Sequence, residues 1–185
     1  AIPLSIGGDH SITYPILQAM SDSYPSLSIL HFDAHGDLYD SLGGNRHSHA
    51  SPFARIMEEG LAQALTQVGI RTLNDHQQTQ VSKFGVKVID MRNWSPDIDL
   101  NLSGTVYLSF DMDVLDPAFA PGVSHHEPGG FTTREVLRMI QKLDLNIVGL
   151  DLVEYNPDRD LNGVTAMTAA KIIKELLAKL LSFQK

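Results

Sequence analysis

The sequence has no cysteine, few basic residues and no long hydrophobic run. The absence of cysteine excludes a disulfide scaffold, a thiolate zinc site and a cysteine nucleophile. The 14 lysine and arginine residues are outnumbered by 22 aspartate and glutamate residues, which gives a net charge of -8. Such a chain repels phosphate backbones, so we expect no nucleic-acid partner. Because no apolar run approaches the ~20 residues that span a bilayer, we also expect no membrane partner.

Two common catalytic motifs are missing as well. The sequence has no Gly-x-Ser-x-Gly elbow, which would carry the nucleophile of an acyl-enzyme. It also has no Gly-x-x-x-x-Gly-Lys-Ser/Thr loop, which would hold phosphate groups. The pair Gly7-Gly8 by itself predicts only a tight turn. The chemistry must therefore come from other side chains.

Enough hydrophobic residues are present for a folded core. They make up 43% of the chain, against 19% charged residues, which argues against wholesale disorder. A length of 185 residues suits one domain, and we predict a single domain over residues 1–185. The chain opens in a strand-like segment that leads at once into Gly7-Gly8-Asp9-His10. We therefore expect this domain to be partial, with a further segment preceding it.

Short apolar runs alternate with amphipathic stretches along the chain. The apolar runs are typical of strands covered on both faces, and they span residues 4–6, 27–32, 64–70, 86–90, 106–110 and 147–152. Helices are predicted over residues 11–20, 52–59, 74–84, 132–143 and 166–181. Ser51 is the predicted N-cap of the second helix, and Thr132 with Glu135 forms a capping box on the fourth. This alternation predicts a three-layer α/β/α fold with a mainly parallel sheet, and residues 94–104 are predicted to form a surface loop.

Acids and histidines follow four of the predicted strands. They are His10 after the first strand, Asp33, His35 and Asp37 after the second, Asp111 and Asp113 after the fifth, and Glu154 after the sixth. In folds of this class, ligands gather at the carboxyl ends of the strands. Extended backbone alternates sides, so residues spaced by two can point the same way. These side chains are therefore expected to share one site.

A cluster of four aspartates needs a cation to offset its repulsion. Carboxylate and imidazole ligands suit manganese, iron or zinc, and the excess of carboxylates favours the harder ions. Taken singly, an Asp-x-Asp pair after a strand is more often a turn or helix cap, and a lone histidine is more often structural. We interpret His31, inside an apolar run, as structural. The combined pattern instead indicates a binuclear metal site of the kind used in hydrolysis.

These motifs resemble the arginase/agmatinase (ureohydrolase) family. The resemblance rests on Gly-Gly-Asp-His-Ser at 7–11, Asp-Ala-His-x-Asp at 33–37, Ser-x-Asp-x-Asp-x-x-Asp-Pro at 109–117 and Glu-x-Asn-Pro at 154–157. Within the family, the plant-type arginase branch is most similar, on the segments 39–40, 48–58, 116–125, 127–130 and 163–167. The resemblance implies an arginase-like fold and two Mn²⁺ ions that activate water for attack on a guanidino group.

The resemblance also implies how the metal ligands divide. One ion would be held by His10, Asp33, Asp37 and Asp111, and the other by Asp33, His35, Asp111 and Asp113. Asp37 would in addition accept a hydrogen bond from the attacking water.

Two further residues would act on the substrate. Glu154 matches the acid that pairs with the guanidinium group, although it could instead cap the turn before Asn156-Pro157. His49 matches the histidine that passes a proton to the leaving amine, and His47, two positions away, is the alternative. Asn45 and His125 are the expected contacts with the rest of the substrate.

The resemblance implies hydrolysis of L-arginine to L-ornithine and urea. The alternatives are agmatine, which gives putrescine and urea, another guanidino or formimino compound, and a non-catalytic metal-binding subunit of an assembly. The family resemblance also implies a homo-oligomer, a trimer or hexamer. It leaves the cytoplasm and the mitochondrial matrix open as compartments.

Overall fold

A six-stranded parallel sheet forms the centre of the protein in a computed structural model, which describes residues 1–100 and 102–183. The strands are β1 (Leu4–Ile6), β2 (Ser28–Phe32), β3 (Ala64–Ile70), β4 (Lys87–Asp90), β5 (Thr105–Asp111) and β6 (Asn146–Val153). All six predicted strands are present, and each boundary agrees within one residue. The prediction succeeds because both faces of a parallel sheet are covered, which makes its strands stand out as apolar runs.

Five α-helices and three short 3-10 helices lie between or after the strands in the described residues. The α-helices are α1 (Thr13–Ser21), α2 (Pro52–Glu58), α3 (Asp75–Phe84), α4 (Thr133–Lys142) and α5 (Val164–Phe183). The 3-10 helices are η1 (His10–Ile12), η2 (Met112–Val114) and η3 (Pro157–Arg159). The first predicted helix thus begins with a 3-10 turn. None of the helices described is both long and apolar enough to cross a membrane.

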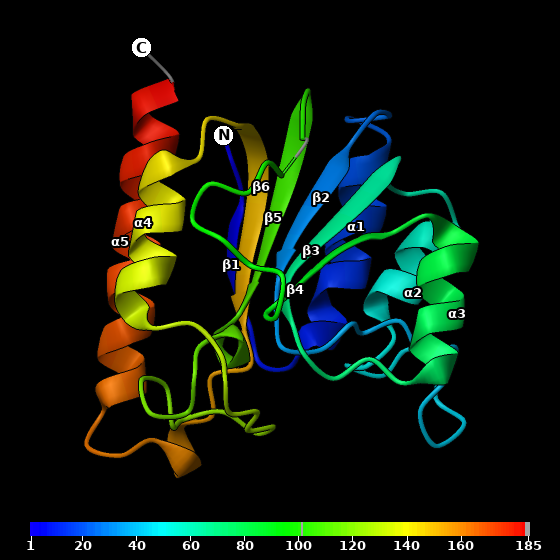
Figure 1. The fold of residues 1–185 in the computed structure, drawn as a ribbon. Helices are drawn as coiled ribbons and strands as arrows, with labels where there is room; N and C mark the ends of the chain where they lie inside the picture. Colours follow the sequence, from blue (N-terminus) through cyan, green and yellow to red (C-terminus); the bar gives the residue numbers. More distant parts are fainter. Residues whose placement is uncertain (101, 184–185) are drawn as a thin grey trace.

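Helices cover both faces of the sheet. Helices α4 and α5 lie on one face, and α1, α2 and α3 lie on the other (Figure 1). Neighbouring residues of one strand enter opposite halves of the core. Tyr107 of β5 packs in the cluster that contains Leu17 of α1 and Phe53 of α2, whereas Leu108 packs in the cluster that contains Leu176 of α5. The predicted three-layer α/β/α fold is confirmed.

The capping predictions have mixed outcomes. Thr132 accepts a hydrogen bond from the backbone N–H of Glu135, and the Glu135 carboxylate accepts one in return, so the capping box is confirmed. Ser51 occupies the N-cap position of α2, as predicted, but its side chain makes no capping hydrogen bond. Its hydroxyl instead lies 3.1 Å from the hydroxyl of Ser48.

The predicted loop 94–104 connects β4 to β5, and Asn101 within it lies outside the described residues.

The strand order creates a crevice at the centre of the sheet. The order is β1-β6-β5-β2-β3-β4, so the connection that follows β2 leads to one side and the connection that follows β5 leads to the other. Such a switch point is where open parallel sheets bind ligands. Strands β2 and β5 pair directly, with Phe32 opposite Phe110. The motifs that begin at Asp33 and Asp111 therefore leave the sheet side by side.

Gly69 lets strand β3 pass close to Asp33, the first residue after β2. It has a φ of +99° and lies where the register between β3 and β4 shifts. A Cβ atom there would lie 2.9 Å from the backbone oxygen of Asp33 and 2.5 Å from a methyl carbon of Val114. Both contacts are too close, so only glycine fits without displacement of the backbone.

We expect Gly69→Ala to lower the free energy of unfolding by about 2–4 kcal/mol, because backbone strain and overpacking add. Gly60→Ala is the matched control. Gly60 also has a positive φ, of +67°, but a Cβ atom there would meet nothing within 4 Å. The control should lose only about 1 kcal/mol. Urea unfolding monitored by circular dichroism measures both values, and equal losses would contradict the packing argument.

Candidate metal centre and substrate cavity

His10 faces three carboxylates that come from two different strand ends. Its Nδ1 atom lies 3.2 Å from an oxygen of Asp33, 3.1 Å from one of Asp37 and 3.1 Å from one of Asp111. Despite these short distances, Nδ1 makes no hydrogen bond with any described residue. The side chain is fully buried. A buried nitrogen lone pair that faces three carboxylate oxygens has the composition of a cation site.

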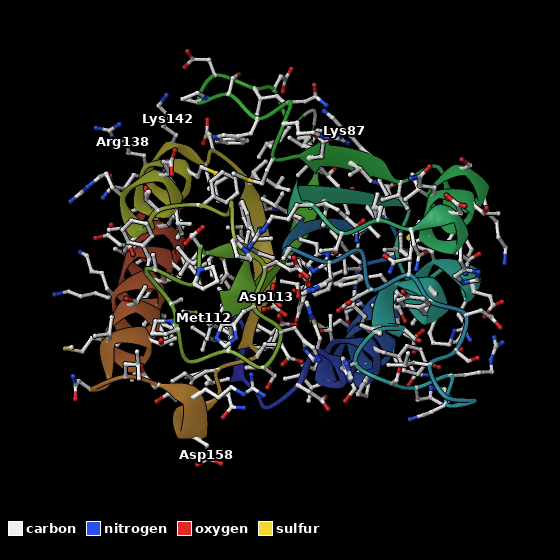
Figure 2. All side chains as sticks on the ribbon, turned by 60° about the horizontal axis from the view of Figure 1, so that its bottom comes forward. Lys87, Met112, Asp113, Arg138, Lys142 and Asp158 are labelled. Atoms are coloured by element: carbon white, nitrogen blue, oxygen red, sulfur yellow. The ribbon has the colours of Figure 1, made fainter. Side chains whose placement is uncertain are left out.

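His35 forms a second group that shares Asp33 with the first. Its Nδ1 atom lies 3.0 Å from an oxygen of Asp113 and 3.3 Å from one of Asp33. The backbone N–H of Ala34 donates to the other Asp113 oxygen over 3.2 Å. The two groups together contain all six residues that the sequence singled out as metal ligands. Figure 2 shows Asp113 near the centre of the view, with Lys87, Arg138 and Lys142 at the outer edge.

Burial and mutual repulsion disfavour the charged form of these acids. Burial, together with neighbouring carboxylates that include Asp33, raises the pKa of Asp113 to about 7. The same causes raise the pKa of Asp111 well above its usual range. A divalent cation reverses both effects, because it favours the ionised carboxylates that bind it. The donors present therefore fit manganese, whose preference is for carboxylate oxygens with some imidazole.

Backbone strain marks two residues of the cavity. Asp37 and Glu154 have φ values of +48° and +63°, and the only other described non-glycine residue with a positive φ is Asn162. The conformation of Glu154 is held by two hydrogen bonds. Its backbone N–H donates to the Gly8 oxygen over 2.8 Å, and its carboxylate accepts from the backbone N–H of His10 over 3.0 Å. Strain of this kind persists where the surrounding structure imposes it, often at functional sites.

A buried network fixes the ring of His10. Its Nε2 atom lies 2.9 Å from the Ser109 hydroxyl, which donates its own hydrogen to Asp151 over 2.7 Å. The other Asp151 oxygen accepts from the hydroxyls of Thr13 and Tyr107, each over 2.8 Å. Because Ser109 has used its hydrogen, it accepts from His10, which places the His10 proton on Nε2. In the neutral ring, Nδ1 then has the lone pair that faces the carboxylates. Without a cation these carboxylates raise the pKa of His10 well above its usual value, against the opposing effect of burial, so a metal ion would take the place of a proton on Nδ1.

A cavity of about 240 Å³ opens above the acids. Among its lining residues are Glu154, His49 and His125. The rings of His49 and His125 stack with centroids 5.3 Å apart, and the ring of His125 meets that of His35 edge-on at 6.0 Å. Tyr39 and Gln77, which the sequence analysis did not predict to be site residues, also line the cavity. No lysine or arginine is among the described lining residues, which suits a cationic substrate.

Two candidates lie outside the cavity wall. His47 is exposed and stacks on Tyr14 with ring centroids 5.4 Å apart. Asn45 is also exposed, and its side-chain oxygen accepts a hydrogen bond from the backbone N–H of His47. The geometry thus favours His49 over His47 as the residue near a substrate. The contact of Asn45 with a substrate stays a prediction.

Arg71 is a supporting residue that the sequence analysis did not identify. It follows β3, and its guanidinium donates to the backbone oxygens of Asp113 (2.8 Å), Gly69 (3.0 Å) and Glu127 (2.7 Å). It therefore joins the Asp113 segment to the segment that carries His125. A basic residue at a strand end was the available signal, but only the structure reveals that its partners are backbone carbonyls.

Comparison with known proteins agrees with this site. The Arginase family model matches residues 1–178. The chain belongs to the arginase family. The predicted family is therefore confirmed, and members of this family act on guanidino substrates and depend on metal ions.

Individual relatives give the same picture. The chain is 52% identical to the mitochondrial arginase of Medicago truncatula over 187 residues, which cover 96% of this chain and 55% of that protein. A solved arginase structure from Medicago truncatula has a TM-score of 0.89 and 50% identity, and the match covers 97% of this chain and 59% of that one. A Mn²⁺-bound triple mutant of a T. brucei arginase-like protein has a TM-score of 0.87 at 32% identity, over 97% of this chain and 60% of that one. The chain thus spans little more than half the length of the arginase it matches.

We expect Asp151→Ala to destabilise the metal-free protein by about 3–5 kcal/mol. The change leaves three buried hydroxyls without their acceptor and removes the support of His10. Tyr107→Phe, the control, removes one of those donors and leaves the bonds from Ser109 and Thr13, so it should cost about 1–2 kcal/mol. Urea unfolding of both variants measures the difference. Equal losses would mean that the network does not depend on the Asp151 carboxylate.

Proposed function

We propose that this chain is the catalytic part of a manganese-dependent arginase, which hydrolyses L-arginine to L-ornithine and urea. The observation that carries the proposal is the bare Nδ1 atom of His10, which is buried and faces oxygens of three aspartates. A second group around His35 shares Asp33 with it. Two ion sites joined by a shared carboxylate suit two-metal hydrolysis. Similarity to plant arginases supports arginine as the substrate.

In this proposal six side chains would hold two Mn²⁺ ions. His10, Asp33, Asp37 and Asp111 would hold one ion, and Asp33, His35, Asp111 and Asp113 would hold the other. When bound, the ions supply Lewis-acid activation of water. Asp37 would also accept a hydrogen bond from the attacking water and orient it toward the substrate.

Glu154 binds the guanidinium group of the substrate. One of its oxygens already accepts the backbone N–H of His10, which fixes the carboxylate at the cavity wall. Burial raises the pKa of Glu154, which disfavours its charge in the absence of a partner. A guanidinium offsets that effect, because it donates two parallel hydrogen bonds to a carboxylate. Glu154 therefore orients the carbon of the substrate toward the acid cluster.

His49 donates a proton to the amine that leaves. It lines the cavity, and its stacking on His125 limits the rotation of its ring. Imidazole suits this step because it both takes up and releases protons near neutral pH. His125 forms the adjoining wall, where it contacts the remainder of the substrate.

Two other expectations from the sequence stay predictions: a trimeric or hexameric assembly, and a single domain over residues 1–185.

The first test is urea release. With manganese added, the purified chain should release urea from L-arginine, and agmatine should be tested beside it. Removal of the metal with a chelator should abolish the release, and renewed addition of Mn²⁺ should restore it, because the metals activate the water. Faster release of urea from agmatine would show that agmatine, and not L-arginine, is the substrate. No urea from either compound, with two ions bound per chain, would remove the enzymatic claim.

The second test compares the two neighbouring histidines. His49→Ala should lower kcat by about 10²–10⁴-fold, the usual contribution of a general acid, while the manganese content stays at the wild-type value. His47→Ala is the matched control, because His47 is exposed and stacks on Tyr14. Its kcat should stay near the wild-type value. The opposite order of the two variants would assign the proton transfer to His47.

A further inference from the structure

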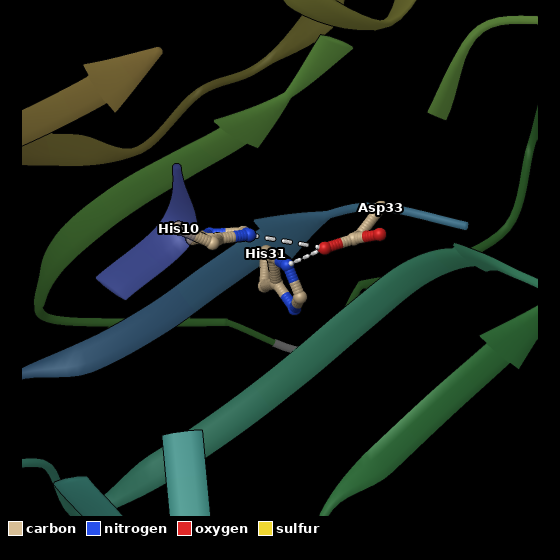
Figure 3. Close-up of side chains that lie close together, drawn as sticks. All are labelled: His10, His31 and Asp33. Carbon is tan, nitrogen blue, oxygen red and sulfur yellow. Dashed lines mark hydrogen bonds and ion pairs between the residues drawn. The ribbon is translucent and has the colours of Figure 1, made fainter. Parts of the chain in front are cut away.

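His31 lies against the shared carboxylate of the two metal groups. It is fully buried in β2, and its ring packs on Phe53 with centroids 4.0 Å apart. Figure 3 shows His31 and His10 both directed at Asp33. Ligand atoms of these three residues lie within 4.8 Å of one another, so distance alone would allow His31 to bind an ion. The hydrogen-bond pattern around the ring decides against that.

Gln67 determines which ring nitrogen of His31 carries the proton. Gln67 lies opposite His31 on β3, and both side chains are fully buried. Its amide nitrogen lies 2.6 Å from the backbone oxygen of Gly36, which can only accept. That contact fixes the orientation of the amide. The same nitrogen lies 3.0 Å from Nδ1 of His31, so its second hydrogen points at the ring.

Nδ1 of His31 therefore accepts, and the proton of the neutral ring lies on Nε2. Nε2 is 2.8 Å from an oxygen of Asp33. A protonated ring nitrogen has no lone pair for a metal ion, but it is a good donor to a carboxylate. His10 presents the opposite case, because its proton lies on Nε2 toward Ser109 and its bare Nδ1 faces the acids. In their neutral forms, His31 thus presents an N–H donor to Asp33, whereas His10 presents a lone pair.

We propose that His31 is a positioning residue: it donates a hydrogen bond from Nε2 to Asp33 and holds this carboxylate in the orientation in which both metal groups would share it. The inference rests on the proposed function. The other Asp33 oxygen accepts the backbone N–H of His35 over 2.6 Å. Each oxygen thus has one hydrogen bond from the protein, and each keeps a free lone pair for one ion.

Gln67 extends this support to the segment that carries the ligands. Its bond to the Gly36 oxygen holds the backbone between His35 and Asp37, and its bond to His31 holds the ring that orients Asp33. One buried amide therefore ties three candidate ligands to β3. Partners of this kind change metal affinity by about 10–100-fold when they are lost.

The first experiment reads the protonation of His31 directly. Nitrogen-15 NMR of the full chain, labelled at histidine, should show His31 as the neutral form with its proton on Nε2. The signal is assigned by its absence in His31→Gln. The form should persist after loading with Zn²⁺, which is diamagnetic and suits imidazole better than Mn²⁺ does. A proton on Nδ1, or loss of the Nε2 proton on loading, would overturn the proposal.

The second experiment compares two variants of similar size. His31→Gln retains an N–H donor at about the place of Nε2, whereas His31→Leu has none. Manganese affinity is measured by titration against a competing chelator, and thermal unfolding of the metal-free proteins controls for stability. We expect His31→Leu to bind manganese about 10–100-fold more weakly and His31→Gln to retain most of the affinity.

Three outcomes contradict the proposal. Wild-type affinity in His31→Leu would show that the bond to Asp33 does not support metal binding. Loss of one bound ion in both variants would show that His31 is itself a ligand. A wild-type chain that binds no manganese would overturn the proposed function and the positioning role with it. If His31→Leu fails to fold, His31→Gln and the NMR measurement still decide the question.

Discussion

The repulsion among four buried aspartates is the constraint on which the site depends. Asp33 and Asp111 follow paired strands, so the sheet holds their carboxylates close whatever their charge. Backbone N–H groups offset part of the cost. His35 donates to Asp33, and Asp113 donates to Asp111 over 2.7 Å. The remaining oxygens face His10, His35 and the cavity. A pair of divalent cations would satisfy these oxygens at once, and the sheet holds the residues that would bind them in fixed positions.

The hydrogen bonds around the acids divide the histidines by role. A neutral imidazole has one donor and one acceptor, so a partner on one nitrogen decides what the other nitrogen can do. Ser109 accepts from His10 and leaves a lone pair toward the acids. Gln67 donates to His31 and leaves an N–H toward Asp33. The same residue type therefore acts once as a candidate ligand and once as a support, at nearly equal distances from one carboxylate.

The sequence was sufficient for the strands and for the candidate ligands, because both follow from local pattern. Apolar runs mark buried strands, and a spacing of two places Asp33, His35 and Asp37 on one side of extended backbone. The supports depend on register between strands. Gln67 meets His31 only because β3 pairs with β2 residue by residue, and Arg71 finds its carbonyls only after the turns at Asp113 and Glu127 have formed. A single sequence does not show which residues of neighbouring strands lie opposite each other. Ser51 illustrates the same limit: the sequence placed it correctly at the N-cap of α2, but its hydroxyl lies beside Ser48 and makes no capping hydrogen bond.

The two strained residues, Asp37 and Glu154, lie on segments that hydrogen bonds hold in place. Asp37 follows Gly36, whose backbone oxygen accepts a hydrogen bond from Gln67. Glu154 is the first residue after β6, and its backbone N–H donates to the oxygen of Gly8. A positive φ costs about 1–3 kcal/mol at each. With ordinary backbone at these positions, each side chain would leave the strand end in a different direction. The strain is therefore best understood as the cost of directing both carboxylates into one cavity, where in the proposed function one would bind a metal ion and the other a guanidinium.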